Sequence, residues 1–473
     1  MKKLSILLML WFSTSLLANQ AFDDRELQVF AKHYQLNYQL DFVTGTLSAE
    51  GEITIANNSA TPADHVPFRL YRMLKVSEIT DNSGNPINFQ QQILSNDHWR
   101  EYQSNYVEIK LDKPIKPNSN YTFKVKFDGP LKGYTEVGQL YVKDSINDEF
   151  SIIRMDTMAY PLFTYPNDKV NRKSLFWLSK YDYDVSVTVP TTHVVANVGE
   201  LVELKTKGEK STYRFKSKLP AWRMDFTVAK YQVKQSGKYK IYSWESEDKI
   251  DKLMKETSDT FDLYTKWFGE LKQKIGYTII QIPDTYGSQA DLTGIIQEGD
   301  AFNHKESLTE LYHEVSHQWN VKPTEESSPR WSEGLASFLQ VLTYDHLQKS
   351  QTMESSLNGT IESLKKRYVK NQKYRETPYL NYGKEGLSAY SVGKVFFKVM
   401  YDLLGEKEFN KIIGGYYHQY VESGSTTEDF IKYVKKNASV NLDKLFEDWA
   451  YTTNYVKLIE SSKSYQDIIK AYR

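Results

Sequence analysis

The 473-residue chain contains no cysteine, and this absence excludes several kinds of structure. Without a thiol the protein has no disulfide bond, no thiolate metal site and no lipid-modified cysteine. Its folding therefore cannot rely on covalent crosslinks, which is compatible with export to a bacterial periplasm.

An excess of charge of either sign is also lacking. Lys and Arg together number 60, Asp and Glu together number 60, and the formal net charge is zero. This balance argues against binding to nucleic acid or to an anionic membrane through overall net charge, and no nucleic-acid motif is present. The length predicts two or three domains, and 40% hydrophobic residues provide ordinary globular cores.

Long apolar runs are absent except at the N-terminus. The basic Met1-Lys2-Lys3 is followed by an apolar run over Leu4–Leu17, and Ala18 then precedes a polar, acidic segment. This layout predicts a signal peptide over residues 1–18, with an uncleaved anchor as the alternative. No later stretch is long and apolar enough to cross a bilayer. We therefore expect an exported protein, in the periplasm or outside a bacterial cell, with no integral membrane span after signal removal.

The residue pattern of the remaining sequence changes from strand-like to helix-like near residue 240. Residues 19–240 contain short alternating runs with β-branched residues, such as Leu47–Ile55, separated by turn clusters. They predict an N-terminal antiparallel β-sandwich or saddle domain. Residues 241–473 are mainly helical, with a helix predicted over 247–268 and a strand over 277–282. The fold class expected is α+β.

Two further local signals lie in the C-terminal half. The segment Leu403-Leu-Gly405 predicts the end of a helix, because glycine is favoured just past a helix C-terminus. The segment Thr426-Thr-Glu-Asp429 predicts a capping box that opens the next helix.

The main chemical signal is the pattern His313-Glu314-Val-Ser-His317. On a helix, positions four apart share a face, so both imidazoles can point at one metal ion. Glu314 is displaced around the helix axis, where it can act as general base towards a water molecule. Two surface histidines and a solvated glutamate are the alternative, but the pattern lies in an apolar, helix-compatible stretch.

A third metal ligand is expected at Glu333. The preceding Ser328-Pro329 favours a helix start, which places Glu333 early in the next helix. Two histidines and one carboxylate form a common catalytic zinc set that leaves a fourth position for water. An ordinary first-turn glutamate favoured by the helix dipole is the alternative, and the histidine motif before it decides against that interpretation.

These segments resemble the gluzincin zinc aminopeptidases, the family of alanyl aminopeptidase and leukotriene hydrolase. The resemblance rests on residues 313–319 and 331–338, and residues 180–200 and 445–449 are similar to the ends of its β-domain and thermolysin-like catalytic domain. It implies one Zn²⁺ per chain, peptide substrates and removal of N-terminal residues. It also implies that the long helical C-terminal domain of larger members is missing.

The resemblance also assigns a role to a tyrosine. The segment Ala389-Tyr-Ser-Val-Gly-Lys394 is similar to the family's tyrosine segment, with Tyr390 at the position that stabilises the tetrahedral oxyanion. A neutral hydroxyl donor suits developing negative charge. The chain contains 35 tyrosines, so this assignment depends on the motif and not on the residue type.

Two differences from the family pattern concern the metal site. The connector between His317 and Glu333 is shorter than usual, which we interpret as a loop deletion that leaves the flanking helices in place. Where the family often has an acid seven residues after the glutamate ligand, this chain has Gln340, so the support of the ligands differs.

A third difference concerns the substrate. The family carries a Gly-Ala-Met-Glu-Asn stretch whose glutamate holds the free α-amine, and the equivalent here is Gly294-Ile-Ile-Gln297-Glu298. Gln297 takes the glutamate's place but supplies no charge. Glu298 could replace it only with a bulge, because neighbouring side chains of a strand face opposite ways. A different carboxylate, such as Asp156, could also hold the amine, or the enzyme could have no strict demand for a free N-terminus.

Three functions follow from these patterns. The first is a zinc metallo-aminopeptidase, with Gly294, Gln297 and Glu298 aligning the substrate as an added strand. The second is a zinc endopeptidase or another hydrolase that needs no free N-terminus. The third is a catalytically dead peptide-binding relative, which the intact set of ligands, base and tyrosine argues against. Side-chain specificity and oligomeric state have no signal in the sequence.

Overall fold

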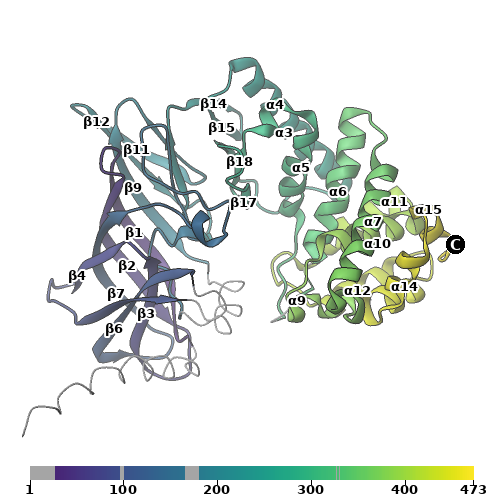
Figure 1. Ribbon diagram of the computed structural model, residues 1–473, viewed down its shortest axis with the longest axis horizontal. Coiled ribbons are helices and arrows are strands. Elements are labelled where there is room, and N and C mark those ends of the chain that lie inside the picture. The colour runs from purple at the N-terminus through teal and green to yellow at the C-terminus, as the bar shows by residue number, and fades with distance from the viewer. Residues whose placement is uncertain (1–26, 96–100, 166–179, 326–327, 330) are drawn as a thin grey trace, which may run out of the picture. The chain divides into compact units, whose positions relative to one another are not determined.

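The computed structural model describes residues 27–95, 101–165, 180–325, 328–329 and 331–473. The predicted signal peptide lies outside the described residues. The chain forms two compact units. Among the residues just given, the first unit contains those up to 233 together with 242–244 and 278–294, and the second contains 234–241, 245–277 and those from 295 onwards. The first is rich in strands and the second in helices, which confirms the predicted α+β fold class (Figure 1).

A seven-stranded sheet dominates the first unit, in the order β11-β12-β9-β1-β2-β7-β4. Its strands are β1 (Val29–Asp41), β2 (Thr46–Asn57), β4 (Lys75–Asp81), β7 (Asn120–Pro130), β9 (Asp182–Pro190), β11 (Glu200–Lys207) and β12 (Lys210–Lys216). All neighbours pair antiparallel except β1 and β9, which pair parallel. The predicted alternation is clear in β1, where Tyr34, Leu36 and Tyr38 are buried and the residues between them are exposed.

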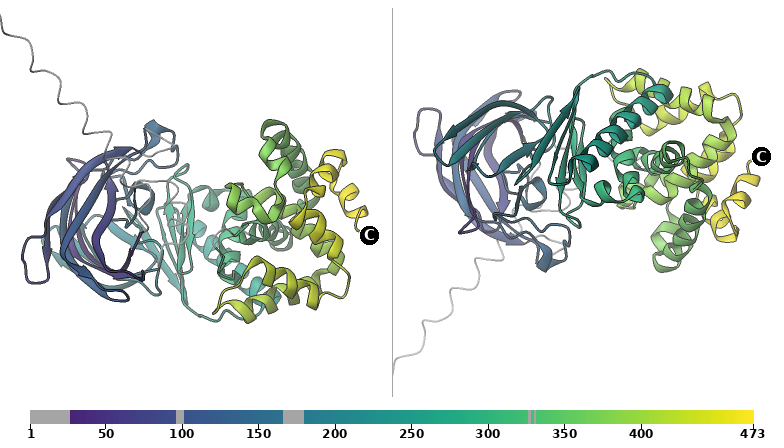
Figure 2. Two further views of the ribbon diagram at one scale, coloured as in Figure 1. Left: turned by 90° about the horizontal axis from the view of Figure 1, so that it is seen from below. Right: turned by 90° about the horizontal axis from the view of Figure 1, so that it is seen from above.

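Two smaller sheets complete the first unit. One has the order β3-β6-β5, with β3 (Ala63–Tyr71), β5 (Phe89–Ser95) and β6 (Gln103–Ile115). The other has the order β10-β13-β8, with β8 (Phe150–Ile153), β10 (Val194–Asn197) and β13 (Phe226–Ala229). Single 3₁₀ turns η1 (Thr135–Val137) and η2 (Met155–Thr157) interrupt the connections. The strongly curved large sheet, seen from two sides in Figure 2, agrees with the predicted saddle.

The strands between residues 232 and 298 form a five-stranded sheet of order β14-β15-β16-β18-β17. They are β14 (Gln232–Ser236), β15 (Tyr239–Ser243), β16 (Tyr277–Ile282), β17 (Gln289–Asp291) and β18 (Gly294–Glu298). The strand predicted over residues 277–282 is confirmed as β16.

The second unit is built mainly of helices. They are α3 (Glu247–Phe268), α4 (Asp300–Asn303), η3 (Lys305–Ser307), α5 (Leu308–Ser316), η4 (His317–Trp319), α6 (Trp331–Gln348), α7 (Met353–Lys370), α8 (Gln372–Glu376), η5 (Tyr379–Asn381), α9 (Tyr382–Glu385), α10 (Tyr390–Leu404), α11 (Glu406–Tyr420), α12 (Thr427–Asn437), α13 (Asp443–Phe446), the π-helical turn η6 (Glu447–Tyr451), α14 (Asn454–Ser461) and α15 (Tyr465–Lys470). None of those in the described ranges is long and apolar enough to span a membrane.

The local predictions for these helices are confirmed. The helix predicted over residues 247–268 is α3. Helix α10 ends at Leu404, and Gly405 follows with a φ of 75°. Thr426 and Asp429 form both halves of the capping box that opens α12.

Helices α6 and α10 cross with their backbones in contact. A Cβ atom added to Gly334 of α6 would lie 2.7 Å from the Cα of Gly393 in α10 and 2.6 Å from the hydroxyl of Tyr379. No larger residue fits either glycine position without movement. Glu333 precedes Gly334 and Tyr390 lies one turn before Gly393, so this crossing fixes two predicted site residues relative to each other.

Candidate metal and substrate site

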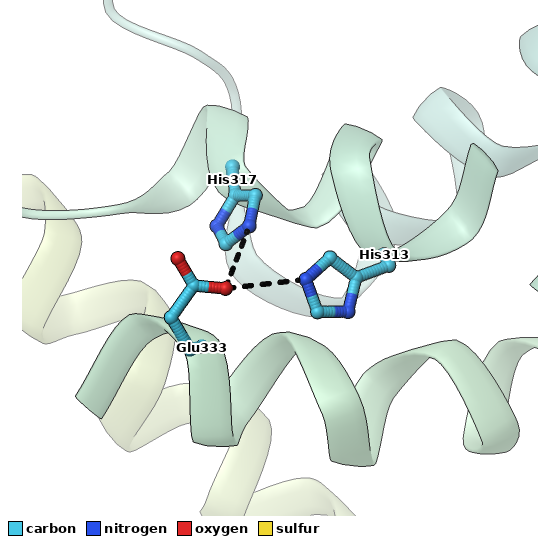
Figure 3. Close-up of side chains that lie close together, drawn as sticks. All are labelled: His313, His317 and Glu333. Carbon is cyan, nitrogen blue, oxygen red and sulfur yellow. Dashed lines mark hydrogen bonds and ion pairs between the residues drawn. The ribbon is translucent and has the colours of Figure 1, made fainter. Parts of the chain in front are cut away.

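Three side chains with metal-binding atoms converge in the second unit. His313 in α5 and His317 in η4, which continues α5, point towards Glu333 in the first turn of α6 (Figure 3). Their donor atoms all lie within 4.8 Å of one another. Within the described parts of the chain, this is the one cluster of at least three His, Cys, Asp or Glu residues with that geometry.

The distances fit a tetrahedral zinc ion. Ligand bonds of about 2.0–2.1 Å at tetrahedral angles separate neighbouring ligand atoms by about 3.3 Å. Glu333 Oε2 lies 3.4 Å from His313 Nε2 and 3.7 Å from His317 Nε2. Two imidazoles and one carboxylate are also the donor set of many catalytic zinc sites.

A second ring of contacts orients the imidazoles. Gln340 Oε1 lies 2.8 Å from Nδ1 of His313 and accepts its hydrogen, so Nε2 keeps its lone pair for a metal. The side-chain amide nitrogen of Asn320 lies 2.6 Å from Nδ1 of His317. With the amide turned by about 180°, its oxygen would accept the Nδ1 hydrogen and leave Nε2 for a metal, as at His313. Gln340, which stands where the family often has an acid, thus contacts a predicted metal ligand.

Glu314 lies beside the three ligands and is half-buried. Burial raises its pKa to about 7; His313 opposes this effect, and the negative charges of Glu333 and Glu310 add to it. A carboxyl group with a pKa near neutrality can take and return a proton at physiological pH. A cation on the ligands would lower this pKa.

Tyr390 begins α10 and stacks on a ligand. Its ring lies parallel to the imidazole of His313, with centroids 5.8 Å apart and an interplanar angle of 13°. The side chain is 39% exposed, so it is both close to the candidate ligands and open to solvent. The structure therefore brings together the ligands, the base and the tyrosine that the sequence singled out.

Gln297 in β18 has a charged hydrogen-bond partner. Its side chain is fully buried, and Nε2 donates a hydrogen bond of 2.8 Å to Oε2 of Glu310 in the first turn of α5. The sequence patterns did not single out Glu310. The signal that could have found it is the four-residue spacing to Glu314, which places both glutamates on one helix face.

The two neighbours of Gln297 in the predicted substrate segment have different surroundings. Glu298 ends β18 and is half-buried. Gly294 begins β18, and a Cβ there would collide with the backbone carbonyl of Thr278 and lie 2.9 Å from Val198. The glycine is therefore required by close packing in the first unit.

Asp156, the further carboxylate considered for the substrate amine, belongs to a charge network of the first unit. Its oxygens accept hydrogen bonds from Arg223 at 2.6 Å, Gln289 at 3.0 Å and Tyr141 at 3.2 Å. Burial raises its pKa, but the guanidinium groups of Arg223 and Arg154 outweigh that effect and the pKa is lowered. Its charge is already compensated within that network.

The short connector before α6 is attached to the start of α12. The backbone N–H of Thr324 donates to the carbonyl of Ser425, and the N–H of Ser425 donates to Lys322, each at 3.0 Å. Glu325 accepts hydrogen bonds from both the backbone and the hydroxyl of Thr427. These contacts hold residues 322–325, the part of the connector that follows the histidine ligands, against the start of α12.

Comparison with known proteins agrees with this arrangement. Residues 296–449 match the peptidase family M1 domain, and this stretch includes all candidate ligands, Glu314 and Tyr390. No curated protein sequence matches the chain. The match and the shared fold confirm the resemblance to the gluzincin aminopeptidases.

Solved structures share the fold over most of the chain. An M1 zinc metallopeptidase from Deinococcus radiodurans is similar with a TM-score of 0.63 and 15% identity, over 89% of this chain and 94% of that chain. A mutant M1 zinc metallopeptidase of that organism bound to a Tyr-Ser-Ala substrate gives a TM-score of 0.62 with the same identity and coverage. A two-domain M1 zinc metallopeptidase mutant bound to L-tryptophan gives 0.61 and 15%, over 92% of this chain and 95% of that chain.

Proposed function

We propose, from the peptidase family M1 domain that residues 296–449 match, that this protein is a zinc-dependent aminopeptidase. The observation that carries the proposal is the convergence of His313, His317 and Glu333 at zinc-like distances, with Glu314 alongside. The related structures with a bound peptide or amino acid support peptide substrates.

A zinc ion held by the three ligands would polarise the scissile carbonyl and make a water molecule more acidic. Glu314 takes the proton of the attacking water and returns it to the leaving amine. The hydroxyl of Tyr390 donates to the carbonyl oxygen as negative charge develops on it. Gln340 keeps the His313 ring in the orientation and tautomer that this chemistry needs. The strand β18 would align the substrate as an added strand.

The first test is cleavage of matched peptides with free and N-acetylated N-termini, followed by mass spectrometry with and without a chelator. We expect stepwise loss of residues from the free peptide, much slower cleavage of the acetylated one, and no cleavage after chelation. The Glu314→Gln variant should bind zinc as the wild type does and lose about 10²- to 10⁴-fold in kcat, the usual contribution of a general base. Full turnover in that variant would refute this role.

A second candidate is a zinc endopeptidase, which the neutral Gln297 favours. Equal cleavage of the free and the acetylated peptide would establish it and would contradict the aminopeptidase proposal. Binding of peptides without cleavage by the zinc-loaded wild type would instead support a catalytically inactive relative.

The location of the protein is a further part of the proposal. The basic start and apolar run of residues 1–18 support export to the periplasm or beyond. Fractionation of cells and the N-terminal sequence of the mature protein test it, and recovery of the full-length chain in the cytoplasm would contradict it.

A further inference from the structure

Helix α5 carries two glutamates on the face that holds the reaction site. Glu310 lies four residues before Glu314, so both point to one side of the helix, about 6 Å apart along its axis. Glu310 is close enough for its negative charge to contribute to the raised pKa of Glu314. The reaction site therefore contains a carboxylate that the chemistry of bond cleavage does not use.

Gln297 holds this carboxylate in place. The Gln297 amide is fully buried in β18, and its N–H donates to Oε2 of Glu310 at 2.8 Å. Each carboxylate oxygen can accept more than one hydrogen bond, so the bond from Gln297 does not by itself keep a ligand from Glu310. Glu310 is half-buried, which lets a ligand reach a charge that the protein has already oriented.

The spacing suits the first residue of a peptide. One residue of extended chain spans about 3.3–3.6 Å. A charge-assisted hydrogen bond adds about 2.8 Å, so a group that binds the α-ammonium lies about 6 Å from the groups at the scissile carbonyl. That distance matches the separation of Glu310 from Glu314 along α5.

The remaining candidate carboxylates fit less well. Glu298 follows Gln297 in β18, and strand alternation sends its side chain to the face opposite the one that meets Glu310. Asp156 is already paired with Arg223 in the first unit.

We propose that Glu310 binds the α-ammonium group of the peptide substrate and so sets the preference for a free N-terminus, with Gln297 as its positioning residue. This inference rests on the proposed aminopeptidase function. It also explains how the site can bind an ammonium group although β18 carries the neutral Gln297, because Glu310 in α5 supplies the negative charge.

The test compares kcat/KM for a free and an N-acetylated peptide in the wild type and in Glu310→Gln. Loss of a hydrogen bond to a charged group should lower kcat/KM for the free peptide by about 10- to 150-fold. The value for the acetylated peptide should stay within a factor of about three, the size of ordinary surface effects. Glu306→Gln removes the same charge from an exposed position four residues earlier and should leave both values unchanged.

An exchange variant tests the pair. Gln297→Glu combined with Glu310→Gln keeps an amide and a carboxylate in contact but moves the charge to the strand, and it should regain part of the preference for the free peptide. An exchange variant that binds zinc normally and shows no more preference than Glu310→Gln would overturn the role of Gln297. Zinc content and thermal unfolding of each variant identify any that misfold.

The outcomes separate the inference from the function on which it rests. If the wild type discriminates strongly between the two peptides and Glu310→Gln discriminates equally well, Glu310 does not bind the amine and the inference is overturned. An equal loss on both peptides also overturns it. If the zinc-loaded wild type does not discriminate at all, the aminopeptidase function itself is wrong.

Discussion

The crossing of α6 and α10 makes a sharp prediction about Gly334→Ala. A methyl group at this position would lie 2.7 Å from the Cα of Gly393 and 2.6 Å from the Tyr379 hydroxyl. Carbon atoms in contact prefer about 3.5–4.0 Å, so the two helices must separate by about 0.8–1.3 Å. Such a shift moves Glu333 away from Tyr390, because each lies within one turn of the crossing.

The energetic cost follows from the same geometry. Overpacking of this size costs about 1–3 kcal/mol. The greater helix propensity of alanine offsets about 0.5–1 kcal/mol of this cost, so the net loss of stability is about 0–2.5 kcal/mol. A displacement of about 1 Å at a catalytic site can lower turnover by about 100-fold. We expect both effects in Gly334→Ala.

Gly359 in α7 provides the matched control. It is exposed, and a Cβ added there meets no atom within 4 Å. The same substitution at Gly359 should therefore stabilise the protein by about 0.5–1 kcal/mol and leave turnover unchanged. Denaturant unfolding and kcat measured on the three proteins give the comparison. If Gly334→Ala and Gly359→Ala shift the unfolding midpoint in the same direction with full turnover, the proposed backbone contact does not constrain the site.

Two further predictions concern side chains near the site. Gln340→Leu removes the acceptor that holds the His313 Nδ1–H, so the affinity for zinc should fall about 10- to 100-fold. Competition with a chelator measures this affinity. An unchanged affinity would contradict the orienting role of Gln340. Burial of Lys394, whose ammonium donates to Ser356, lowers its pKa from 10.5 to about 8, so its charged form destabilises the folded state at pH values below about 8. Lys394→Met should therefore stabilise the protein at pH 7, and this gain in stability should shrink as the pH rises from 8 towards 10.5. Denaturant unfolding across this pH range measures the gain. A gain in stability that is constant across the range would contradict the burial effect.

The parts of the site that could be predicted from the sequence are those encoded within one or two turns of helix. His313 and His317 share a face because of their spacing, and the Ser-Pro before α6 marks the helix that carries Glu333. The limits of α3 and β16 were predicted for the same reason, since amphipathic periodicity and turn residues are local.

The contacts that could not be predicted join elements that are distant in the fold. The bond between Gln297 and Glu310 connects a strand with a helix, and no spacing rule covers such a pair. The sequence allowed Asp156 as a carboxylate that binds the substrate amine, but in the structure Asp156 forms an ion pair with Arg223. The Gly334–Gly393 contact likewise needs both helices in place, although each glycine stands in a motif that also carries a site residue.

The single parallel pair in the large sheet has a consequence for how the first unit folds. Strands β2, β7 and β4 extend the sheet from one edge of β1, and β9, β12 and β11 extend it from the other. The β1–β9 junction joins residues about 150 positions apart, and contacts of such long range form slowly. Until β9 arrives, β1 has an open edge that can pair with another chain. Folding intermediates in which β9 has not yet paired with β1 are therefore the species most exposed to aggregation.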